Sequence, residues 1–422
     1  MLFDLAWLNR LQSYKQLVVG FSGGLDSTVL LHWCASVPAL KSRLLAVHVN
    51  HGLSSNALSW QIHCERWCAQ LQIPFVTHAV EFNRDANIEE GARTARYALF
   101  QDLVPKDGCL LLGHHKDDQA ETLLLNLFRG AGVDGLAAMP EIASFGLGVV
   151  ARPLLSCFQV QLSHYAQCHQ LQWIEDESNE DSYYSRNYLR HRVMPLLNEK
   201  WPGVVSNLAR TAKHCQSAQM NLYALAQEDC GALKKETTSL DTAPLENLSE
   251  ERLVNVLRYW LKSNAVKSPS TAVCSQIIRL IDAAEDANPV VRWHDISIRR
   301  YQKILYIERE TFDVRQEAFW TDFPKPLKLG NKIVHVRPAH QGLFIPQGAQ
   351  LRMTFRQGGE SFVFRGQTKS LKKLFQQWHI PPWLRAGVPL LYIDNQLAAV
   401  AGYAISDSFF VTREPAWELW FD

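Results

Sequence analysis

The sequence lacks any hydrophobic run long enough to cross a membrane, because no apolar stretch approaches the roughly 18 residues that a transmembrane helix needs. Residues 1–16 carry Asp4 within their apolar part and have no small-residue cleavage site, which is unlike a secretory signal peptide. We therefore expect a protein with no membrane partner and a cytoplasmic location.

The sequence also lacks a cysteine framework and a surplus of charge. Its nine cysteines are scattered, which is typical of reduced thiols in a cytosol. Cys64 and Cys68, with His63 beside them, have a spacing that could form a metal-binding face, but no second pair accompanies them, and buried helix thiols are the favoured interpretation. Lys and Arg number 43 against 42 Asp and Glu, so bulk charge neither demands nor excludes a nucleic-acid partner.

Strand-like and helix-like segments alternate in the first half of the chain. Apolar runs at 17–21, 44–49, 74–82 and 109–113 precede helical patterns at 28–35, 58–71, 88–103 and 120–128. Strands that are apolar on both faces and separated by helices predict an α/β fold with a doubly wound parallel sheet. Such sheets bind ligands beyond the carboxyl ends of their strands, so the loops after Phe21, Val49 and Gly113 are the first candidates for a site.

The pattern changes after this region. Helical periodicity dominates from Trp201 to about Asn288, a strand hairpin is predicted between 290 and 307, and a Pro-rich stretch at 323–326 precedes a β-rich end. We predict three domains: a nucleotide-binding catalytic domain at 1–200, a mainly helical substrate domain with a terminal hairpin at 201–320, and a small α+β domain at 321–422.

A glycine-rich turn joins the first predicted strand to the first helix. Its residues are Ser22, Gly23, Gly24, Leu25, Asp26 and Ser27. Glycines leave backbone N–H groups free to converge on an anion, and the helix that follows presents its positive end. The Lys of the Walker pattern is missing, and so is the dinucleotide pattern GxGxxG. An ordinary strand–turn–helix junction, with Asp26 and Ser27 as helix caps, is the alternative interpretation.

The string SGGLDS resembles the phosphate loop of the ATP-pyrophosphatase (PP-loop) family, whose members adenylate a carbonyl oxygen and release pyrophosphate. Further strings resemble the tRNA(Ile)-lysidine synthetase branch of that family. They are HVNHGL at 48–53, IEEGARTARY at 88–97, HHKDDQAET at 114–122, WIED at 173–176 with RNYLR at 186–190, and, near the end, Lys372-Lys373 and PPWLR at 381–385. Asn50 departs from the histidine that is common there, on the side expected to contact adenine.

This resemblance implies roles for particular residues. It places ATP on residues 22–27 with His48 and Asn50, Mg²⁺ on Asp26, and lysine recognition and catalysis on His114, Asp118 and Glu121. Asp118 and Glu121 are three residues apart and can share one helix face, which suits a Mg²⁺ or an amine; carboxylates that merely complement a helix dipole are the alternative. Arg93 and Arg96 could neutralise a leaving pyrophosphate or hold RNA phosphate, and Arg186 and Arg190 could grip RNA backbone or nucleotide. A solvated helix face is the alternative for both arginine pairs.

Basic and aromatic residues alternate between 352 and 385. Lys369, Lys372, Lys373 and Arg385 belong to this stretch, which suits an RNA backbone with stacked bases. In the alternative interpretation the aromatics form the core of a small domain and the charges are a solvated face.

The resemblance implies a ligase that adenylates C2 of the wobble cytidine of tRNA(Ile) with a CAU anticodon, using ATP and Mg²⁺, and then joins the ε-amine of free L-lysine there. The alternatives are a tRNA thiolase, disfavoured because the sequence has no CxxC pair, and a non-catalytic RNA-binding relative, disfavoured by the intact SGGLDS string. The sequence leaves the oligomeric state open, a homodimer included.

Overall fold

The computed structural model describes residues 5–52, 54, 56–80, 88–177, 183–230, 238–283, 289–309 and 316–422. The chain divides into two compact units, Met1–Leu225 and Ala226–Asp422. Among the described residues, no helix combines the length and apolar character that crossing a membrane requires.

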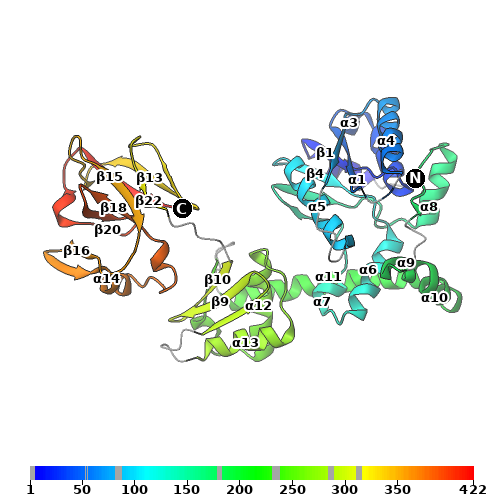
Figure 1. The fold of residues 1–422 in the computed structure, drawn as a ribbon. Helices are drawn as coiled ribbons and strands as arrows, with labels where there is room; N and C mark the ends of the chain where they lie inside the picture. The colour runs from blue at the N-terminus through cyan, green and yellow to red at the C-terminus, as the bar shows by residue number, and fades with distance from the viewer. Residues whose placement is uncertain are drawn as a thin grey trace. The chain divides into compact units, whose positions relative to one another are not determined.

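A six-stranded sheet forms the centre of the first unit (Figure 1). Its strands are β1 (Gln16–Gly20), β2 (Leu44–Asn50), β3 (Phe75–Ala79), β4 (Gly108–Leu111), β5 (Ile142–Phe145) and β6 (Gly148–Ala151), in the order β3-β2-β1-β4-β6-β5. All neighbouring pairs are parallel except β5 with β6. The predicted parallel α/β sheet is confirmed, whereas the antiparallel β5–β6 pair was missed because only residues 146 and 147 separate its strands, so it lacks the strand–helix alternation.

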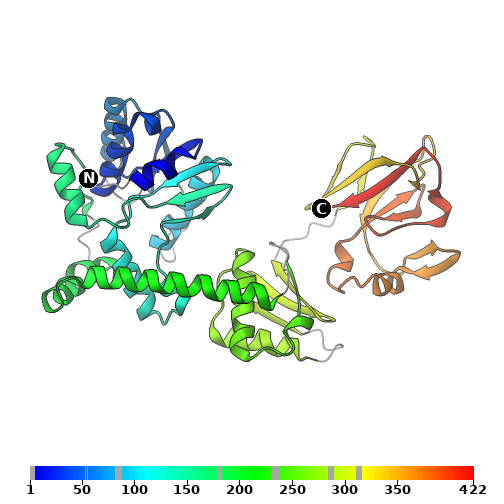
Figure 2. The ribbon, with the colours of Figure 1, turned by 180° about the vertical axis from the view of Figure 1, so that it is seen from behind.

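Helices cover both faces of this sheet, as Figures 1 and 2 show from opposite sides. In chain order, the helices as far as Asp229 are α1 (Leu5–Gln12), α2 (Leu25–Ser36), α3 (Pro38–Lys41), α4 (Ala57–Leu71), α5 (Ile88–Leu103), α6 (Lys116–Phe128), α7 (Val133–Leu136), α8 (Gln159–Cys168), α9 (Ser185–Tyr188), the π-helical turn η2 (Leu189–Val193), α10 (Met194–Lys200) and α11 (Val204–Asp229), and α11 continues past the end of the first unit at Leu225. Alternate residues of β1 enter different cores: Leu17 and Val19 pack with α2, and Val18 packs with Phe100 of α5. A strand buried on both faces is why its sequence reads as continuously apolar.

The second unit begins with a four-stranded antiparallel sheet covered by two helices. The sheet has the order β7-β10-β9-β8, from β7 (Ser239–Asp241), β8 (Val290–Trp293), β9 (Ile296–Tyr301) and β10 (Ile304–Arg309). The 3-10 turn η3 (Ala243–Leu245) and helices α12 (Glu250–Ser263) and α13 (Thr271–Ile281) complete it. Trp260, Ile277 and Ile298 lie in one buried cluster, so each helix faces the sheet with its apolar side.

The remainder of the second unit is rich in strands, as predicted for the terminal part. Two five-stranded sheets have the orders β11-β15-β18-β19-β20 and β12-β13-β22-β14-β21, and β16 pairs with β17. The strands are β11 (Ala318–Phe319), β12 (Leu327–Leu329), β13 (Lys332–Ala339), β14 (Gly342–Leu343), β15 (Leu351–Phe355), β16 (Ser361–Phe364), β17 (Gln367–Ser370), β18 (Pro389–Ile393), β19 (Gln396–Val400), β20 (Ala404–Ile405), β21 (Phe410–Val411) and β22 (Ala416–Phe421). Helix α14 (Leu371–Gln377) and the 3-10 turns η4 (Arg385–Gly387) and η5 (Asp407–Phe409) lie among them.

The order of strands in the first sheet determines where a ligand can bind. The chain runs outward from β1 through β2 to β3, and then returns to add β4 on the other side of β1. The loops after β1 and β4 therefore diverge at a topological switch point, the usual place for a ligand in such sheets.

Candidate functional site

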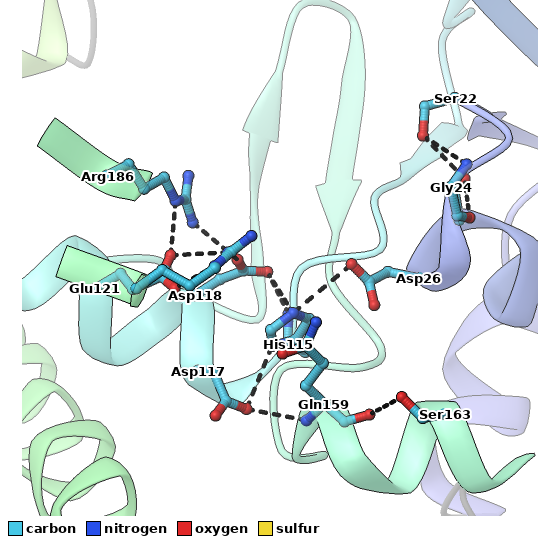
Figure 3. Close-up of polar contacts among 12 residues, drawn as sticks. Ser22, Gly24, Asp26, His115, Asp117, Asp118, Glu121, Gln159, Ser163 and Arg186 are labelled. Atoms are coloured by element: carbon cyan, nitrogen blue, oxygen red, sulfur yellow. Dashed lines mark hydrogen bonds and ion pairs between the residues drawn. The ribbon is translucent and has the colours of Figure 1, made fainter. Parts of the chain in front are cut away.

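The turn after β1 has the geometry of an anion-binding loop. Gly23 has a φ of 86°, a conformation that favours glycine, and Gly24 is the N-cap of α2. The Gly24 N–H donates to Ser22 Oγ at 3.3 Å, and the Ser27 hydroxyl donates to the Gly24 carbonyl at 3.0 Å (Figure 3). Ser22 Oγ lies 3.1 Å from Ser27 Oγ, so both hydroxyls gather where α2 begins. Leu25 instead packs against the buried core under the loop.

The loop after β4 closes directly on this turn. A methyl group placed on Gly113 would lie 3.0 Å from the backbone carbon of Asp26 and 3.1 Å from the nitrogen of Ser27. Only a residue without a side chain allows the two loops to approach this closely. The first residues of α6 are thereby brought beside the first residues of α2.

His115 lies between the two loops and is surrounded by carboxylates (Figure 3). Its Nε2 is 3.7 Å from Asp26 Oδ2 and 3.5 Å from Asp118 Oδ2, and its Nδ1 is 3.4 Å from Asp117 Oδ2. Burial would lower the pKa of His115, but its interaction with Asp117 and the charges of Asp118 and Asp26 together raise it. His114 was predicted at this site and His115 was not, because a His-His pair in a sequence does not reveal which ring faces the carboxylates.

One carboxylate oxygen of Asp26 makes no hydrogen bond. Burial raises the pKa of Asp26 to about 6, with the charge of His115 opposing the shift and that of Asp118 adding to it. Its Oδ1 is buried and has no hydrogen-bond partner. An orphaned oxygen on a partly desolvated carboxylate, next to the phosphate loop, suits a cation.

Two carboxylates of α6 meet two arginines. Arg186 donates from Nε to Glu121 Oε2 at 2.8 Å and from a terminal nitrogen to Asp118 Oδ1 at 3.0 Å. Arg190 donates from Nε to Glu121 Oε1 at 2.7 Å and from a terminal nitrogen to Asp118 Oδ1 at 2.9 Å. The Glu121 side chain is only 2% exposed, and charge-assisted pairs of this kind are the strong ones. The four residues form what we call the acid–arginine cluster, in which the charges balance.

The pKa of Asp118 follows from the same surroundings. Burial would raise it, but the charges of His115 and Arg186, together with the hydrogen bond from the His115 backbone N–H at 3.0 Å, lower it. Asp118 thus stays ionised while it caps α6 and binds both arginines. The structure brings together Asp118, Glu121, Arg186 and Arg190, which the sequence analysis had assigned separately to an amine and to RNA.

His114 remains neutral beside this cluster. Burial lowers the pKa of His114 to about 3, the charge of Asp118 opposes the shift, and the charges of Arg152, Arg186 and Arg93 add to it. A group that binds protons this weakly is a poor proton acceptor near pH 7. This low pKa therefore favours a neutral imidazole over the proton transfer that was predicted from the sequence.

Arg93 and Arg96 both lie on α5. Arg93 lies over the Tyr97 ring at 5.0 Å and, with Glu90 and Thr94, lines a hollow of about 290 Å³. Arg96 is close enough to His51 that its charge adds to burial in lowering the pKa of His51 to about 4. The charge of Arg93 acts on His114 and that of Arg96 on His51, and both histidines follow the carboxyl ends of sheet strands.

His48 and Asn50, predicted on the adenine side, contact the protein itself. His48 is buried, and its Nδ1 lies 3.0 Å from the Phe21 carbonyl and 3.6 Å from Cys64 Sγ. Asn50 Oδ1 accepts from the Gly52 N–H at 2.8 Å. These contacts hold the ends of β1 and β2 in place beneath the phosphate loop.

The basic residues of the terminal part differ in exposure. Lys372 and Lys373 on α14 are exposed, and Lys369 is half-buried. Arg385 is buried and donates from Nε to the Ile380 carbonyl at 2.8 Å, so this bond serves the fold. Phe362 and Phe375 are fully buried, so these aromatics form core as the alternative interpretation held.

Within the described ranges, no group of three or more His, Cys, Asp and Glu side chains is arranged to hold a metal ion. Cys64 and Cys68 are both buried, which agrees with helix thiols packed in the core.

The fold, the phosphate loop and the carboxylates beside it define a nucleotide-binding protein of the PP-loop class. The PP-loop domain family matches residues 5–197, the TilS substrate binding domain matches 240–306, and the TilS substrate C-terminal domain matches 351–420.

Relatives match along nearly the whole chain. A tRNA(Ile)-lysidine synthase of Legionella pneumophila (strain Lens) is 54% identical over 98% of this chain and 97% of its own. One from Coxiella burnetii is 38% identical over 96% of this chain and 92% of its own. Among solved structures, a U34-tRNA thiolase from Methanococcus maripaludis is 16% identical, with a TM-score of 0.40 over 50% of this chain and 80% of that one. The chain belongs to the tRNA(Ile)-lysidine synthase family.

Proposed function

We propose that this chain forms lysidine in the CAU anticodon of tRNA(Ile) in two steps at one edge of its parallel sheet. ATP adenylates the C2 oxygen of the wobble cytidine with release of pyrophosphate, and the ε-amine of free L-lysine then displaces AMP at C2. The observation that carries the proposal is the junction of the two loops, which sets the phosphate loop beside the acid–arginine cluster, with His115 between Asp26 and Asp118.

The phosphate loop supports the adenylation step. The Ser22 and Ser27 hydroxyls and the N–H groups at the start of α2 can donate to phosphate oxygens, and the helix end favours their charge. A carbonyl oxygen is a poor leaving group until a phosphate is attached to it, and this explains why the reaction consumes ATP. Arg93 and Arg96 supply positive charge for the departing pyrophosphate.

Asp26 would hold a Mg²⁺ bound to ATP. Mg²⁺ in nucleotide sites uses one or two carboxylates together with phosphate oxygens, which fits a single orphaned carboxylate oxygen beside the loop. When bound, the ion would neutralise charge on the pyrophosphate. Its positive charge would also lower the pKa of Asp26 and keep this carboxylate ionised.

The acid–arginine cluster supports recognition of lysine. Asp118 and Glu121 already bind two guanidinium groups, so their oxygens are arranged to accept N–H donors from a cation. For the lysine ammonium to bind there, at least one arginine must leave, because Glu121 has both oxygens occupied. The phosphates of a bound tRNA are suitable new partners for Arg186 and Arg190.

The exposed Lys372 and Lys373, with Lys369, offer a second contact for RNA on the terminal domain. Phosphate contacts of this kind fix the position of the RNA and carry no sequence information. In this proposal residues 1–200 carry catalysis, residues 201–320 bind the substrate and residues 321–422 contact RNA. A cytoplasmic location suits an enzyme whose substrate is a tRNA.

The test is incorporation of radiolabelled lysine into tRNA(Ile) with a CAU anticodon, in the presence and absence of Mg-ATP. We expect label at the wobble cytidine only with ATP. Ser27→Ala should lower kcat/KM for ATP by about tenfold, since it removes a hydroxyl donor to a charged group. Ser36→Ala is the matched control, because Ser36 lies at the other end of α2 and bonds only its own helix. Intact tRNA binding without labelling would overturn the proposal, and sulfur in the product would identify a thiolase.

A further inference from the structure

A segment that follows α8, distant in sequence from the phosphate loop, donates a hydrogen bond to the loop. The Ile174 N–H donates to the Gly23 carbonyl at 2.8 Å, and the Thr28 hydroxyl donates to the same oxygen at 3.2 Å. Ile174 lies in the chain after α8, and it packs, with Trp173, against the buried core of the first unit. Two donors on one carbonyl fix the orientation of the Gly23–Gly24 peptide.

The Gly24 N–H of that peptide would face a bound phosphate. In a trans peptide the C=O and the N–H point in opposite directions. With the Gly23 oxygen held by Ile174 and Thr28, the Gly24 N–H is directed the other way, toward Ser22 Oγ (Figure 3). The bond to Ile174 therefore determines where one of the loop's N–H donors points.

Two side chains lie where a Cβ of Gly23 would be. A methyl group placed there would lie 2.5 Å from Ile174 Cδ1 and 2.8 Å from Cys64 Sγ. Burial raises the pKa of Cys64 to about 12, so it stays a neutral thiol and packs like a small apolar side chain. Gly23 has no room for a side chain, because Ile174 and Cys64 together fill the space where its Cβ would lie.

From these contacts we propose that Ile174 is a positioning residue for ATP: it holds the phosphate loop in the conformation that presents the Gly24 N–H to a phosphate oxygen. Ile174 itself touches no reacting atom. The proposal rests on the proposed function for the identity of the ligand.

Shortening the Ile174 side chain keeps its backbone N–H but removes the packing at Gly23 and against the core that holds this N–H in place, so the loop loses preorganisation. The apparent affinity for a ligand falls in proportion to the fraction of molecules in the binding-competent conformation. If Ile174→Ala reduces that fraction to about a tenth, the Kd for ATP rises about tenfold. Lysine binds at the acid–arginine cluster instead, so its KM should change by less than about twofold.

Ile142→Ala is the matched control. Ile142 is also half-buried and packs against the same core cluster, but it lies on β5 at the edge of the sheet. Both variants should lose similar thermal stability, since both remove the same atoms from one cluster. Only Ile174→Ala should weaken ATP binding, and Ile174→Val should give an intermediate Kd because it keeps the branched side chain.

The experiment is equilibrium dialysis of full-length wild type and the three variants with Mg-ATP, followed by steady-state kinetics with tRNA(Ile) and lysine. A Kd that rises in the order Ile, Val, Ala at position 174, with Ile142→Ala equal to wild type, is the expected result. If the Ile174 variants had the Kd of wild type, or if Ile142→Ala raised the Kd as much as Ile174→Ala, this inference would be overturned and the proposed function would stand. Absence of ATP binding by the wild type would instead overturn the proposed function.

If Ile174→Ala does not fold, Ile174→Val decides the question. Its Kd must exceed that of wild type for the inference to stand.

Discussion

Removing one member of the acid–arginine cluster should destabilise the first unit far more than an exposed substitution does. Glu121 is 2% exposed and binds Arg190 Nε at 2.7 Å. In Arg190→Gln, Glu121 keeps only its bond from Arg186, and Asp118 loses one of its two guanidinium donors. Breaking a buried pair from one side costs about 3–5 kcal/mol, and because Arg186 remains we expect about 3 kcal/mol here.

A double-mutant cycle separates the pairing from other effects. Glu121→Gln leaves two guanidiniums that are each about a quarter exposed and can reach water, so we expect a smaller loss of about 1–2 kcal/mol. In the double variant no buried charge is left unpaired at this position. Its loss should therefore be smaller than the sum of the two single losses by about 2 kcal/mol.

The assay is equilibrium urea unfolding, with hydrogen–deuterium exchange of α6 peptides identifying the transition that belongs to the first unit. Arg192→Gln is the control, since Arg192 is an exposed residue of the same π-helical turn and should change stability by less than about 0.5 kcal/mol. Additivity of the two single losses within about 0.5 kcal/mol would refute the pairing argument.

Three further predictions concern acid stability, the phosphate loop and RNA. Because the pKa of His114 is about 3 in the folded chain and about 6.5 when unfolded, the unfolded chain binds this proton first, and stability falls as pH falls below 6.5. The free energy of unfolding of wild type should fall between pH 7.5 and 5.0, and in His114→Gln this fall should be smaller by about 2 kcal/mol. Urea unfolding measures it, and an unchanged pH dependence would contradict the prediction. Gly23→Ala should abolish detectable ATP binding in dialysis, because a methyl group meets Ile174 and Cys64 at a φ of 86°; binding within twofold of wild type would refute it. Lys372→Ala with Lys373→Ala should weaken tRNA binding and reduce its salt slope by about 2 in filter binding while leaving the Kd for ATP unchanged, and an unaltered slope would place the RNA elsewhere.

Local patterns were sufficient to predict the parallel sheet and the glycine turn at the end of β1. The apolar runs at β1, β2 and β4 are buried in the sheet as expected, because strands covered on both faces must be apolar throughout. The glycines and hydroxyls of the phosphate loop lie within the six residues 22–27, so the turn that they form could also be predicted. The strands β5 and β6 form a hairpin with no helix between them, so the alternation of strands and helices does not reveal them.

Contacts between distant segments were beyond sequence reasoning. Arg186 and Arg190 are separated from Glu121 by 65 and 69 residues, and only the packing of α9 and η2 beside α6 brings them together. Nor does the sequence reveal that His115 rather than His114 lies among the carboxylates, or that Ile174 bonds to Gly23. Charged residues on helices are usually solvated, so their burial in pairs depends on tertiary structure.

The central claim is that ATP binds at the phosphate loop and lysine at the acidic pair. Its most direct test is to measure the two half-reactions separately in Asp118→Asn. The asparagine keeps an oxygen that can accept the His115 N–H, but it removes the charge that a lysine ammonium needs. Pyrophosphate release that depends on ATP and tRNA should continue near the wild-type rate, while lysine incorporation at saturating ATP should fall at least about tenfold. Equal loss of both half-reactions, or full incorporation of lysine, would contradict the assignment of ATP to the phosphate loop and lysine to the acidic pair.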